Sequence, residues 1–231
     1  MSDLSASGVE LPDLDLLKKF DIPAPRYTSY PTADRFTSAL TAEDYEEALR
    51  NRENEKNKRA LSVYVHIPFC NDVCYYCGCN KIVTRDHDRA TGYLDVIAKE
   101  ADLVKQHLTG DTEIEQLHFG GGTPTTLSAS QLKKLFDVIS DNFDLSALRE
   151  YTVEAGRPDT VTQDKLIALK NAKVGRISIN PQTFNDDVLN TIGRRHTSHQ
   201  TVEAFELAKK CGFDNINMDL IAGLPGDTFS S

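Results

Sequence analysis

Polar and apolar residues alternate in five short segments that begin at Leu61. The segments cover residues 61–69, 114–120, 151–156, 176–180 and 215–223. Alternation with a period of two predicts β-strands that have one apolar and one polar face. Between them, apolar residues recur at three- and four-residue spacing, which predicts amphipathic helices, as at Leu94, Ile97, Ala101 and Val104. Strands that alternate with helices predict a parallel sheet built from right-handed βαβ units.

The ends of two predicted helices carry their own signals. Ser128 with Gln131, and Thr197 with Gln200, match the capping box, in which each side chain bonds to the backbone of the other residue. Gly212 follows the second of these helices and suits the left-handed conformation that often ends a helix. We therefore expect helices to begin just after residues 128 and 197, and the later one to end just before Gly212.

The polar faces of the predicted strands indicate what kind of sheet they form. Helices can cover only the apolar faces, so the polar faces must meet one another or water. Glu154 and Asp219 lie on these polar faces, and a buried carboxylate without a partner is strongly destabilising. We therefore expect an α/β fold in which the parallel strands form an incomplete TIM-type barrel with a polar lumen, unlike the filled interior of a complete barrel. We also expect the barrel to be truncated after its fifth strand.

The first 60 residues differ in pattern from the rest of the chain. A short amphipathic segment at 14–20 precedes a proline-bounded segment at 22–36, which we expect to be extended. A highly charged helix is expected over residues 41–60. We therefore divide the chain into an N-terminal extension, residues 1–60, and a barrel domain, residues 61–231.

Composition and charge limit the possible partners. The chain of 231 residues has 39% hydrophobic residues and a net charge of −9 at pH 7. An acidic protein is poorly suited to non-specific binding of nucleic acid or anionic membrane, because both require a basic surface. The N-terminus lacks the pattern of a signal peptide, and no apolar run is long enough to span a membrane. We expect a monomeric cytoplasmic protein that binds neither nucleic acid nor membrane.

Loops with unusual composition follow the predicted strands. The cysteine-rich segment follows the first strand, "GGGTP" at 120–124 the second, residues 156–159 the third, Gln182 the fourth and "GLPG" at 223–226 the fifth. In parallel α/β folds, functional residues gather at the carboxyl ends of the strands. "GGGTP" alone is a weak signal, because it is neither a Walker A motif nor a dinucleotide fingerprint.

Four of the five cysteines lie within ten positions, in "HIPFCNDVCYYCGCN". Buried structural thiols are an unfavourable explanation for this polar loop. A closed four-thiolate zinc site is a serious alternative, but the one-residue gap between Cys77 and Cys79 is shorter than the usual ligand spacing. The third interpretation is an iron–sulfur cluster held by Cys70, Cys74 and Cys77. One iron of such a cluster lacks a protein ligand and is open to a small molecule.

The Cys-x3-Cys-x2-Cys loop resembles that of the radical S-adenosylmethionine enzymes. Three longer segments, "PRYTSYPTA" (25–33), "YVHIPFCNDVCYYCGCNKIVTR" (64–85) and "HFGGGTPTTL" (118–127), resemble the oxygen-independent coproporphyrinogen III oxidase family. The resemblance implies a partial barrel that holds a four-iron, four-sulfur cluster and S-adenosylmethionine. Its implied reaction is the radical decarboxylation of two propionates of coproporphyrinogen III to vinyl groups, which gives protoporphyrinogen IX in anaerobic haem biosynthesis. It also implies a reduced flavodoxin- or ferredoxin-type electron donor.

The resemblance also implies roles for individual residues. Cys70, Cys74 and Cys77 would ligate iron, and Cys79 would lie beside the cluster without binding it. The residues that would bind a first S-adenosylmethionine are Tyr64, Gly121 and Glu154. Those that would line the site of a second one are Tyr76, Gly122, Thr123, Gln182, Arg194 and Asp219. The basic residues nearest to this region, and so the candidates for binding substrate carboxylates, are Arg26, Lys81, Arg85 and Arg89. Arg194 and Arg195 can alternatively form a solvated surface pair, and Cys211 is most simply a core residue.

Two departures from the family pattern leave other functions open. From about Tyr151 the sequence is closer to the coproporphyrinogen dehydrogenase-like proteins of Gram-positive bacteria. The chain also ends just after the fifth predicted strand, where the family continues with a sixth strand and a C-terminal domain. The alternatives are a haem-handling relative that has the same cluster but does not turn over porphyrinogen, and a zinc-stabilised binding module. "PRYTSYPTA" and Cys79 favour the oxidase.

Overall fold

The computed structural model describes residues 13–22, 32–86, 88–110 and 112–228. The chain divides into two compact units, Met1–Tyr45 and Glu46–Ser231. The first contains helix α1 (Leu14–Phe20), the 3-10 helix η2 (Ala33–Arg35) and the start of α2 (Ala42–Glu53). The division expected at residue 60 stays a prediction. Of the N-terminal motif "PRYTSYPTA", all but the last two residues, and with them Arg26, lie outside the described residues.

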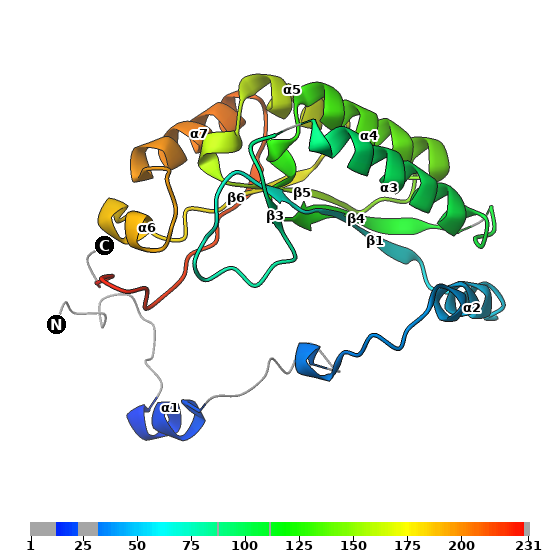
Figure 1. The fold of residues 1–231 in the computed structure, drawn as a ribbon, viewed down its shortest axis with the longest axis horizontal. Helices are drawn as coiled ribbons and strands as arrows, with labels where there is room; N and C mark the ends of the chain where they lie inside the picture. The colour runs from blue at the N-terminus through cyan, green and yellow to red at the C-terminus, as the bar shows by residue number, and fades with distance from the viewer. Residues whose placement is uncertain (1–12, 23–31, 87, 111, 229–231) are drawn as a thin grey trace. The chain divides into compact units, whose positions relative to one another are not determined.

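Five parallel strands of the second unit form one sheet, in the order in which they follow one another along the chain (Figure 1). They are β1 (Leu61–Ile67), β4 (Ile114–Gly121), β5 (Glu150–Gly156), β6 (Arg176–Ile179) and β7 (Asn215–Asn217). All neighbouring pairs are parallel. Sequential parallel strands form the wall of a (β/α) barrel. The prediction of a partial barrel is therefore confirmed.

Helices cover one face of this sheet (Figure 1). These are α3 (Arg89–Lys105), α4 (Ala129–Asn142), α5 (Gln163–Asn171) and α7 (Ser198–Lys210), while the short α6 (Asp186–Thr191) follows β6. The 3-10 helices η3 (Pro124–Thr126) and η4 (Pro158–Thr160) come soon after β4 and β5. Among the residues described, no helix combines the length and the apolar character that crossing a membrane requires.

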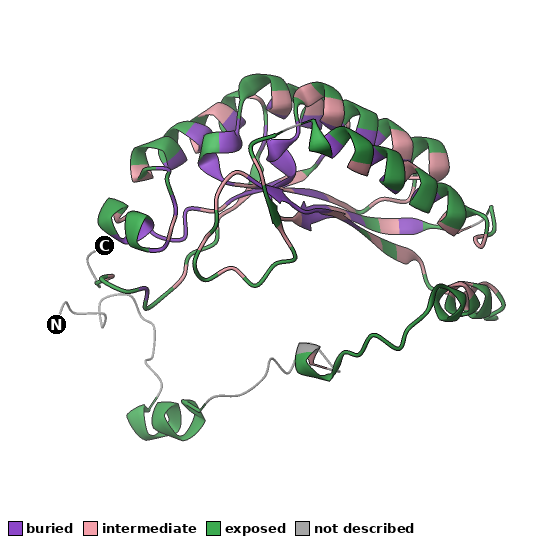
Figure 2. Ribbon diagram, in the orientation of Figure 1, coloured by how far each residue is buried: buried purple, intermediate pink, exposed green. Residues whose placement is uncertain are grey.

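The core lies between the apolar face of the sheet and these helices, as the buried residues in Figure 2 show. Each strand contributes alternate residues, such as Val65, Leu117, Val153 and Ile177. Cys211 is partly buried and packs against this cluster, in agreement with its expected place in the core. The alternation read from the sequence therefore separates the packed face from the polar face.

Both predicted capping boxes are present. Ser128 accepts a hydrogen bond from the Gln131 backbone at the start of α4, and Thr197 accepts one from the Gln200 backbone at the start of α7. Gly212 follows α7 with φ +86°, a left-handed conformation that costs glycine little. These local sequence signals therefore predicted both helix starts and the end of α7 correctly.

Two predicted elements are shorter than expected. The charged helix expected over 41–60 ends at Glu53. The Glu53 carboxylate accepts hydrogen bonds from Lys58, Thr109 and Thr112, and these bonds hold the chain in place where α2 ends. The strand expected over 215–223 ends at Asn217, and one isolated bridge then joins Leu220 to Gln182. Leu220 is exposed rather than buried because the chain leaves the sheet there.

Two leucines of α3 provide a matched test of this packing. Leu94 is 1% exposed, whereas Leu103 is 59% exposed. We expect Leu94→Ala to lower the free energy of unfolding by about 2–5 kcal/mol through lost burial and a residual cavity, and Leu103→Ala to change it by less than about 0.5 kcal/mol. Urea unfolding followed by circular dichroism measures both. Equal losses would show that α3 does not pack on the sheet through Leu94.

Candidate active site

The cysteine segment forms a loop that begins after β1. Its two ends come back together as a separate pair of short strands. Two short parallel strands, β2 (Phe69–Cys70) and β3 (Ile82–Val83), close its base. The Ile82 amide donates to the Pro68 carbonyl at 2.7 Å, and the Thr84 amide donates to the Cys70 carbonyl at 2.9 Å. The intervening residues carry Cys74, Cys77 and Cys79. The fold thus presents four thiols on one closed loop at the carboxyl edge of the sheet.

The glycine segment after β4 packs directly against the base of this loop. The Gly122 amide donates to the Ile67 carbonyl at 2.8 Å, and the Thr123 amide donates to the Phe69 carbonyl at 2.9 Å. A Cβ atom on Gly122 would stand 2.7 Å from the carbonyl oxygens of Pro68 and Phe69, which is too close for any side chain. The Thr123 hydroxyl lies 3.5 Å from Cys70 Sγ. The glycines therefore allow the backbone contact that brings Thr123 to a cysteine.

Two buried arginines surround Cys74. Arg157, directly after β5, donates from Nη2 to Cys74 Sγ at 3.2 Å, and Arg194, after α6, lies with Nη1 3.7 Å from the same sulfur. Burial by itself raises the pKa of the Cys74 thiol, but hydrogen bonds and charge from the two guanidinium groups outweigh it and hold the pKa below its usual value. Cys74 is therefore surrounded by groups that stabilise a thiolate.

The thiols of Cys70 and Cys79 lie in a less favourable setting for negative charge. Burial is the main cause of the raised pKa of Cys70, and the neighbouring Cys74 and Cys77 add to it. Cys79 also has a raised pKa, through burial first, then through Cys77 and through the charge of Glu154. These mutual interactions show that the four cysteines share one electrostatic environment. A bound cation would relieve the repulsion among their thiolates.

The polar face of the sheet begins beside the cysteine loop. Tyr64 Oη lies 3.1 Å from His66 Nδ1, and His66 Nε2 lies 2.8 Å from the Asn80 carbonyl within the loop. On the next strands, His118 Nε2 lies 3.0 Å from Glu154 Oε1. A Cβ atom at Gly120 would be 3.0 Å from the Tyr64 ring and 3.1 Å from the Glu154 carboxyl carbon. Tyr64 and Glu154 thus approach each other across Gly120, which has no side chain to separate them.

A second group of polar contacts lies at the ends of β6 and β7. The Gln182 amide donates to the Asp219 carbonyl at 3.0 Å, and the Asp219 amide donates to Asn180 Oδ1 at 3.3 Å. Arg194 donates to the carbonyl oxygens of Gly156 and Asn180. A series of contacts therefore runs from Gln182 to Asp219, then to Asn180 and on to Arg194. Arg194 in turn contacts Cys74.

The side chains at this edge fit a bound metal group. Three buried side-chain atoms of the described residues have no hydrogen-bond partner, namely Asn71 Oδ1, Arg194 Nε and His196 Nε2. Asn71 lies in the cysteine loop, and Arg194 and His196 follow α6. Where the structure describes the chain, no three His, Cys, Asp or Glu side chains converge on a single metal ion. In a cluster each thiolate ligates a different iron, so its ligands need not converge on one point.

Most of the residues proposed for the site from the sequence gather at this edge. The cysteines, Tyr64, Tyr76, Gly121, Gly122, Thr123, Glu154 and Arg194 are linked by the contacts above or by mutual electrostatic effects. Their individual roles stay predictions. The alternative of a solvated surface pair is wrong for Arg194, which is 4% exposed because it inserts between strand ends, whereas Arg195 is exposed.

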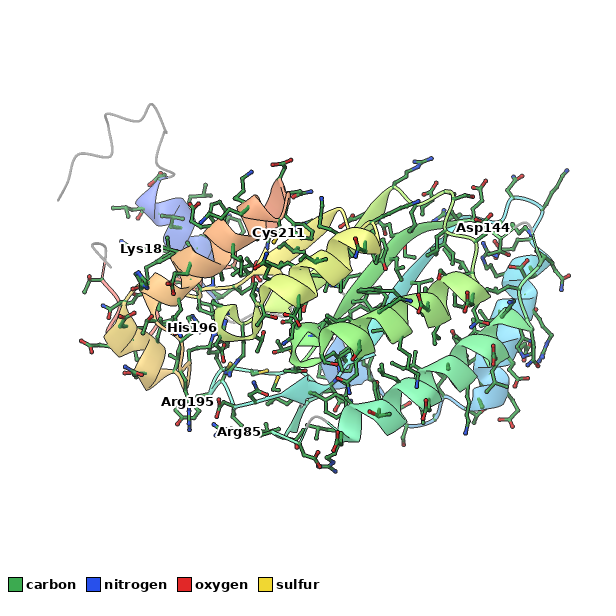
Figure 3. All side chains as sticks on the ribbon, turned by 90° about the horizontal axis from the view of Figure 1, so that it is seen from above. Lys18, Arg85, Asp144, Arg195, His196 and Cys211 are labelled. Atoms are coloured by element: carbon green, nitrogen blue, oxygen red, sulfur yellow. The ribbon has the colours of Figure 1, made fainter. Side chains whose placement is uncertain are left out.

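Sequence reasoning missed two charged residues of the site. The sequence analysis places Arg157 only within the loop at 156–159, and it does not single out Asp72, which lies between Cys70 and Cys74. Asp72 lies 3.1 Å from Arg85, 3.4 Å from Arg195 and 3.7 Å from Arg157. Figure 3 shows Arg85, Arg195 and His196 gathered at one end of the unit, far from Asp144. A basic residue directly after a strand, at the edge that holds the cysteines, was the available signal.

Comparison with known proteins shows which family the chain resembles. A family model described as the radical SAM superfamily matches residues 64–231. The oxygen-independent coproporphyrinogen III oxidase of Pseudomonas aeruginosa is 38% identical over 218 residues, which cover 94% of this chain and 47% of that protein. The oxygen-independent coproporphyrinogen-III oxidase-like protein HemZ of Bacillus subtilis is 39% identical over 176 residues, 74% of this chain and 34% of that protein.

A solved structure gives the same result. Coproporphyrinogen III oxidase (HemN) from Escherichia coli, described as a radical SAM enzyme, aligns with a TM-score of 0.80 and 37% identity, over 94% of this chain and 47% of that one. The chain thus spans about half the length of the first relatives it matches, and the shared half includes the whole cysteine loop and all five strands of the sheet.

Two glycines of the site allow a matched substitution test. Gly122→Ala places a methyl group 2.7 Å from two backbone carbonyl oxygens, whereas Gly78, within the cysteine loop, has no atom within 4 Å of such a group. We expect Gly122→Ala to lower the free energy of unfolding by about 1–3 kcal/mol, as overpacking does, and Gly78→Ala to be tolerated. Chemical unfolding measures this. A tolerated Gly122→Ala would show that the loop base is not packed against β4.

Proposed function

Because the chain belongs to the radical SAM superfamily, whose members use a four-iron, four-sulfur cluster with S-adenosylmethionine, we propose that these residues bind both and catalyse radical chemistry on a porphyrinogen. The observation that carries the proposal is the closed loop that holds Cys70, Cys74 and Cys77 beside the polar face of the sheet. The substrate and the reaction are inferred from the names of relatives about twice as long as this chain.

Cys70, Cys74 and Cys77 are the proposed cluster ligands. Arg157 and Arg194 offset the negative charge of the Cys74 thiolate, and Thr123 lies in hydrogen-bond range of Cys70. Cys79 follows the third ligand by two residues and interacts with Cys77 on one side and with Glu154 and Tyr64 on the other. We therefore assign Cys79 to the boundary between the cluster loop and the polar face of the sheet, without a bond to iron.

The polar face supplies groups suited to a zwitterionic, nucleoside-containing ligand. The Glu154 carboxylate can accept hydrogen bonds from ribose hydroxyls or from an amino group, and Tyr64 presents an aromatic face that is 57% exposed. Gln182, Asp219 and Arg194 offer an amide, a carboxylate and a cation a short distance along the same edge. Once bound, the cluster and S-adenosylmethionine supply a carbon radical able to remove a hydrogen atom from an unactivated carbon.

Coproporphyrinogen III is the proposed substrate. Each converted propionate side chain would lose carbon dioxide, a hydrogen atom that the carbon radical takes up, and one electron that passes to a one-electron oxidant. It would thereby become a vinyl group, and two such conversions would give protoporphyrinogen IX. The substrate carries four carboxylates, so the protein must present basic groups near the site. Lys81, Arg85 and Arg89 lie in or just after the cysteine loop. Lys81 donates to the Cys77 carbonyl at 3.1 Å and Arg85 pairs with Asp72 at 3.1 Å, so Arg89, which is exposed at the start of α3, is the most available of the three.

The remaining partners are part of the same proposal. A reduced flavodoxin- or ferredoxin-type protein would supply electrons, and the chain would act as a monomer in the cytoplasm, without binding nucleic acid or membrane. The haem-handling alternative shares the cluster and differs only in turnover. The zinc alternative requires four ligands around one ion, and the described residues contain no such group.

Cysteine substitutions test the metal centre. We expect the anaerobically reconstituted protein to bind about four irons per chain and to be brown. Cys70→Ala, Cys74→Ala and Cys77→Ala should each abolish the colour and most of the bound iron, whereas Cys79→Ala should retain both. Iron, sulfide and zinc analysis measures the outcome. A colourless protein that holds one zinc tightly would contradict the cluster and support the binding module.

An anaerobic assay tests the reaction. We expect the reconstituted protein, with dithionite, S-adenosylmethionine and coproporphyrinogen III, to form 5'-deoxyadenosine together with a porphyrinogen that has lost one or two carboxyl groups, both measured by mass spectrometry. Cys74→Ala is the matched control and should form neither. Absence of 5'-deoxyadenosine from a protein with four irons would contradict the radical chemistry. Cleavage without any decarboxylated product would contradict the substrate and favour the haem-handling alternative.

A further inference from the structure

Arg157 is the most deeply buried charged side chain at the site. It is 2% exposed, although it follows directly after a strand at the open edge of the sheet. Burial of a guanidinium is costly unless it is paired with an anion and its N–H groups are hydrogen-bonded. The position therefore requires a negatively charged partner.

The nearest carboxylate cannot be the full partner of Arg157. Asp72 lies 3.7 Å from Arg157 Nη1, beyond hydrogen-bond distance, and it also pairs with Arg85 at 3.1 Å and Arg195 at 3.4 Å. One carboxylate thus faces three guanidinium groups. The shortest polar contact of the Arg157 guanidinium is instead the one from Nη2 to Cys74 Sγ at 3.2 Å. The Cys74 thiolate therefore supplies the negative charge that offsets the positive charge of the Arg157 guanidinium.

Arg194 makes a second, longer contact with the same sulfur. Its Nη2 donates to two backbone carbonyl oxygens, those of Gly156 and Asn180, and its Nη1 lies 3.7 Å from the sulfur. Arg194 is thus held mainly by the strand ends. Arg157 makes the closer, charge-assisted contact to the thiolate.

A charged N–H donor on a cysteine sulfur changes the energy of the metal group that the sulfur ligates. Reduction of an iron–sulfur cluster adds one negative charge, part of which lies on its sulfurs. A cation and a hydrogen bond at that sulfur stabilise the reduced form more than the oxidised form, so both raise the reduction potential. The effect is strongest where water is excluded, as around the buried Arg157.

We propose that Arg157 acts through Cys74 to raise the reduction potential of the cluster, which makes Arg157 a positioning and tuning residue and not a ligand. The inference rests on the proposed function, because it presumes that Cys74 binds iron. The step concerned is the one-electron reduction of the cluster by a low-potential donor such as dithionite. The electron goes to the cluster, the donor is oxidised, and no bond of the protein forms or breaks.

The test compares Arg157→Gln with Arg195→Gln. Both substitutions remove one positive charge near Asp72, but Arg195 is exposed and, among the described residues, makes no hydrogen bond or ion pair with a cysteine. The reconstituted proteins are titrated anaerobically, and the reduced cluster is followed by electron paramagnetic resonance. At a fixed potential near the wild-type midpoint, we expect the ratio of reduced to oxidised cluster to fall about tenfold in Arg157→Gln, which is about 59 mV for a one-electron couple. Arg195→Gln should match the wild type.

The outcomes separate this inference from the proposed function. An unchanged midpoint in Arg157→Gln, with a full complement of iron, would overturn the inference and leave the cluster assignment standing. Equal shifts in both variants would also overturn it, since they would show a general effect of charge. A wild-type chain that binds no cluster would refute the proposed function, and with it the inference.

A measurement on the unaltered protein covers the case in which Arg157→Gln fails to fold or loses its cluster. An N–H donor on Cys74 couples to the iron–sulfur stretching modes, so exchange into deuterium oxide should shift the corresponding resonance Raman bands of the wild type. Arg157→Lys, which keeps a charge and N–H donors, should retain the cluster and give a midpoint between those of the wild type and a neutral variant. Absence of a deuterium shift in the wild type would overturn the inference.

Discussion

The site depends on a close approach of two backbone segments that only glycine permits. The chain after β4 runs so near the base of the cysteine loop that Gly122 has carbonyl oxygens where a side chain would begin. Two amide-to-carbonyl hydrogen bonds, from Gly122 and Thr123, join the segments at this point. The loop is otherwise polar and largely exposed, so its own packing cannot fix it. The base of the loop is therefore held by β1 and β4, the two strands with the most extensive register.

Ion pairs also hold the parts of the site together. The chain has a net charge of −9, yet arginines gather around the cysteine loop. Asp72, within that loop, pairs with arginines from three separate segments of the chain. Exposed ion pairs of this kind contribute little on their own, but Arg157 and Asp72 are largely buried, and their network ties the loop to the end of β5. Of these three arginines, Arg157 also donates to Cys74 Sγ, so structural and chemical roles coincide at that side chain.

The sequence predicts the elements of the fold and the place of the site better than it predicts the contacts within the site. The alternation of residues such as Val65 and Tyr64 identified the strands and separated the packed face from the polar face, because period-two patterning depends only on local geometry. The motif spacing located the cysteines and "GGGTP" on one edge. Arg157 was not predicted, since its importance arises from a contact with a residue 83 positions away in the chain. The end of β7 was also misplaced, because apolar residues such as Leu220 continue the alternation after the chain has left the sheet.

Gln182 shows how local strain and function meet at the far side of the site. It is buried and has φ +72°, a left-handed conformation that is uncommon for residues other than glycine. Such a residue costs about 1–3 kcal/mol and persists only where its surroundings determine its conformation. Here the backbone of Gln182 is held on both sides, by its amide to Asp219 and by its carbonyl to the Ile221 amide at 2.9 Å. That isolated bridge keeps Asp219 next to Asn180, to which Arg194 also bonds. The left-handed conformation of Gln182 thus allows hydrogen bonds that join the end of β7, through Asn180 and Arg194, to the polar network around Cys74.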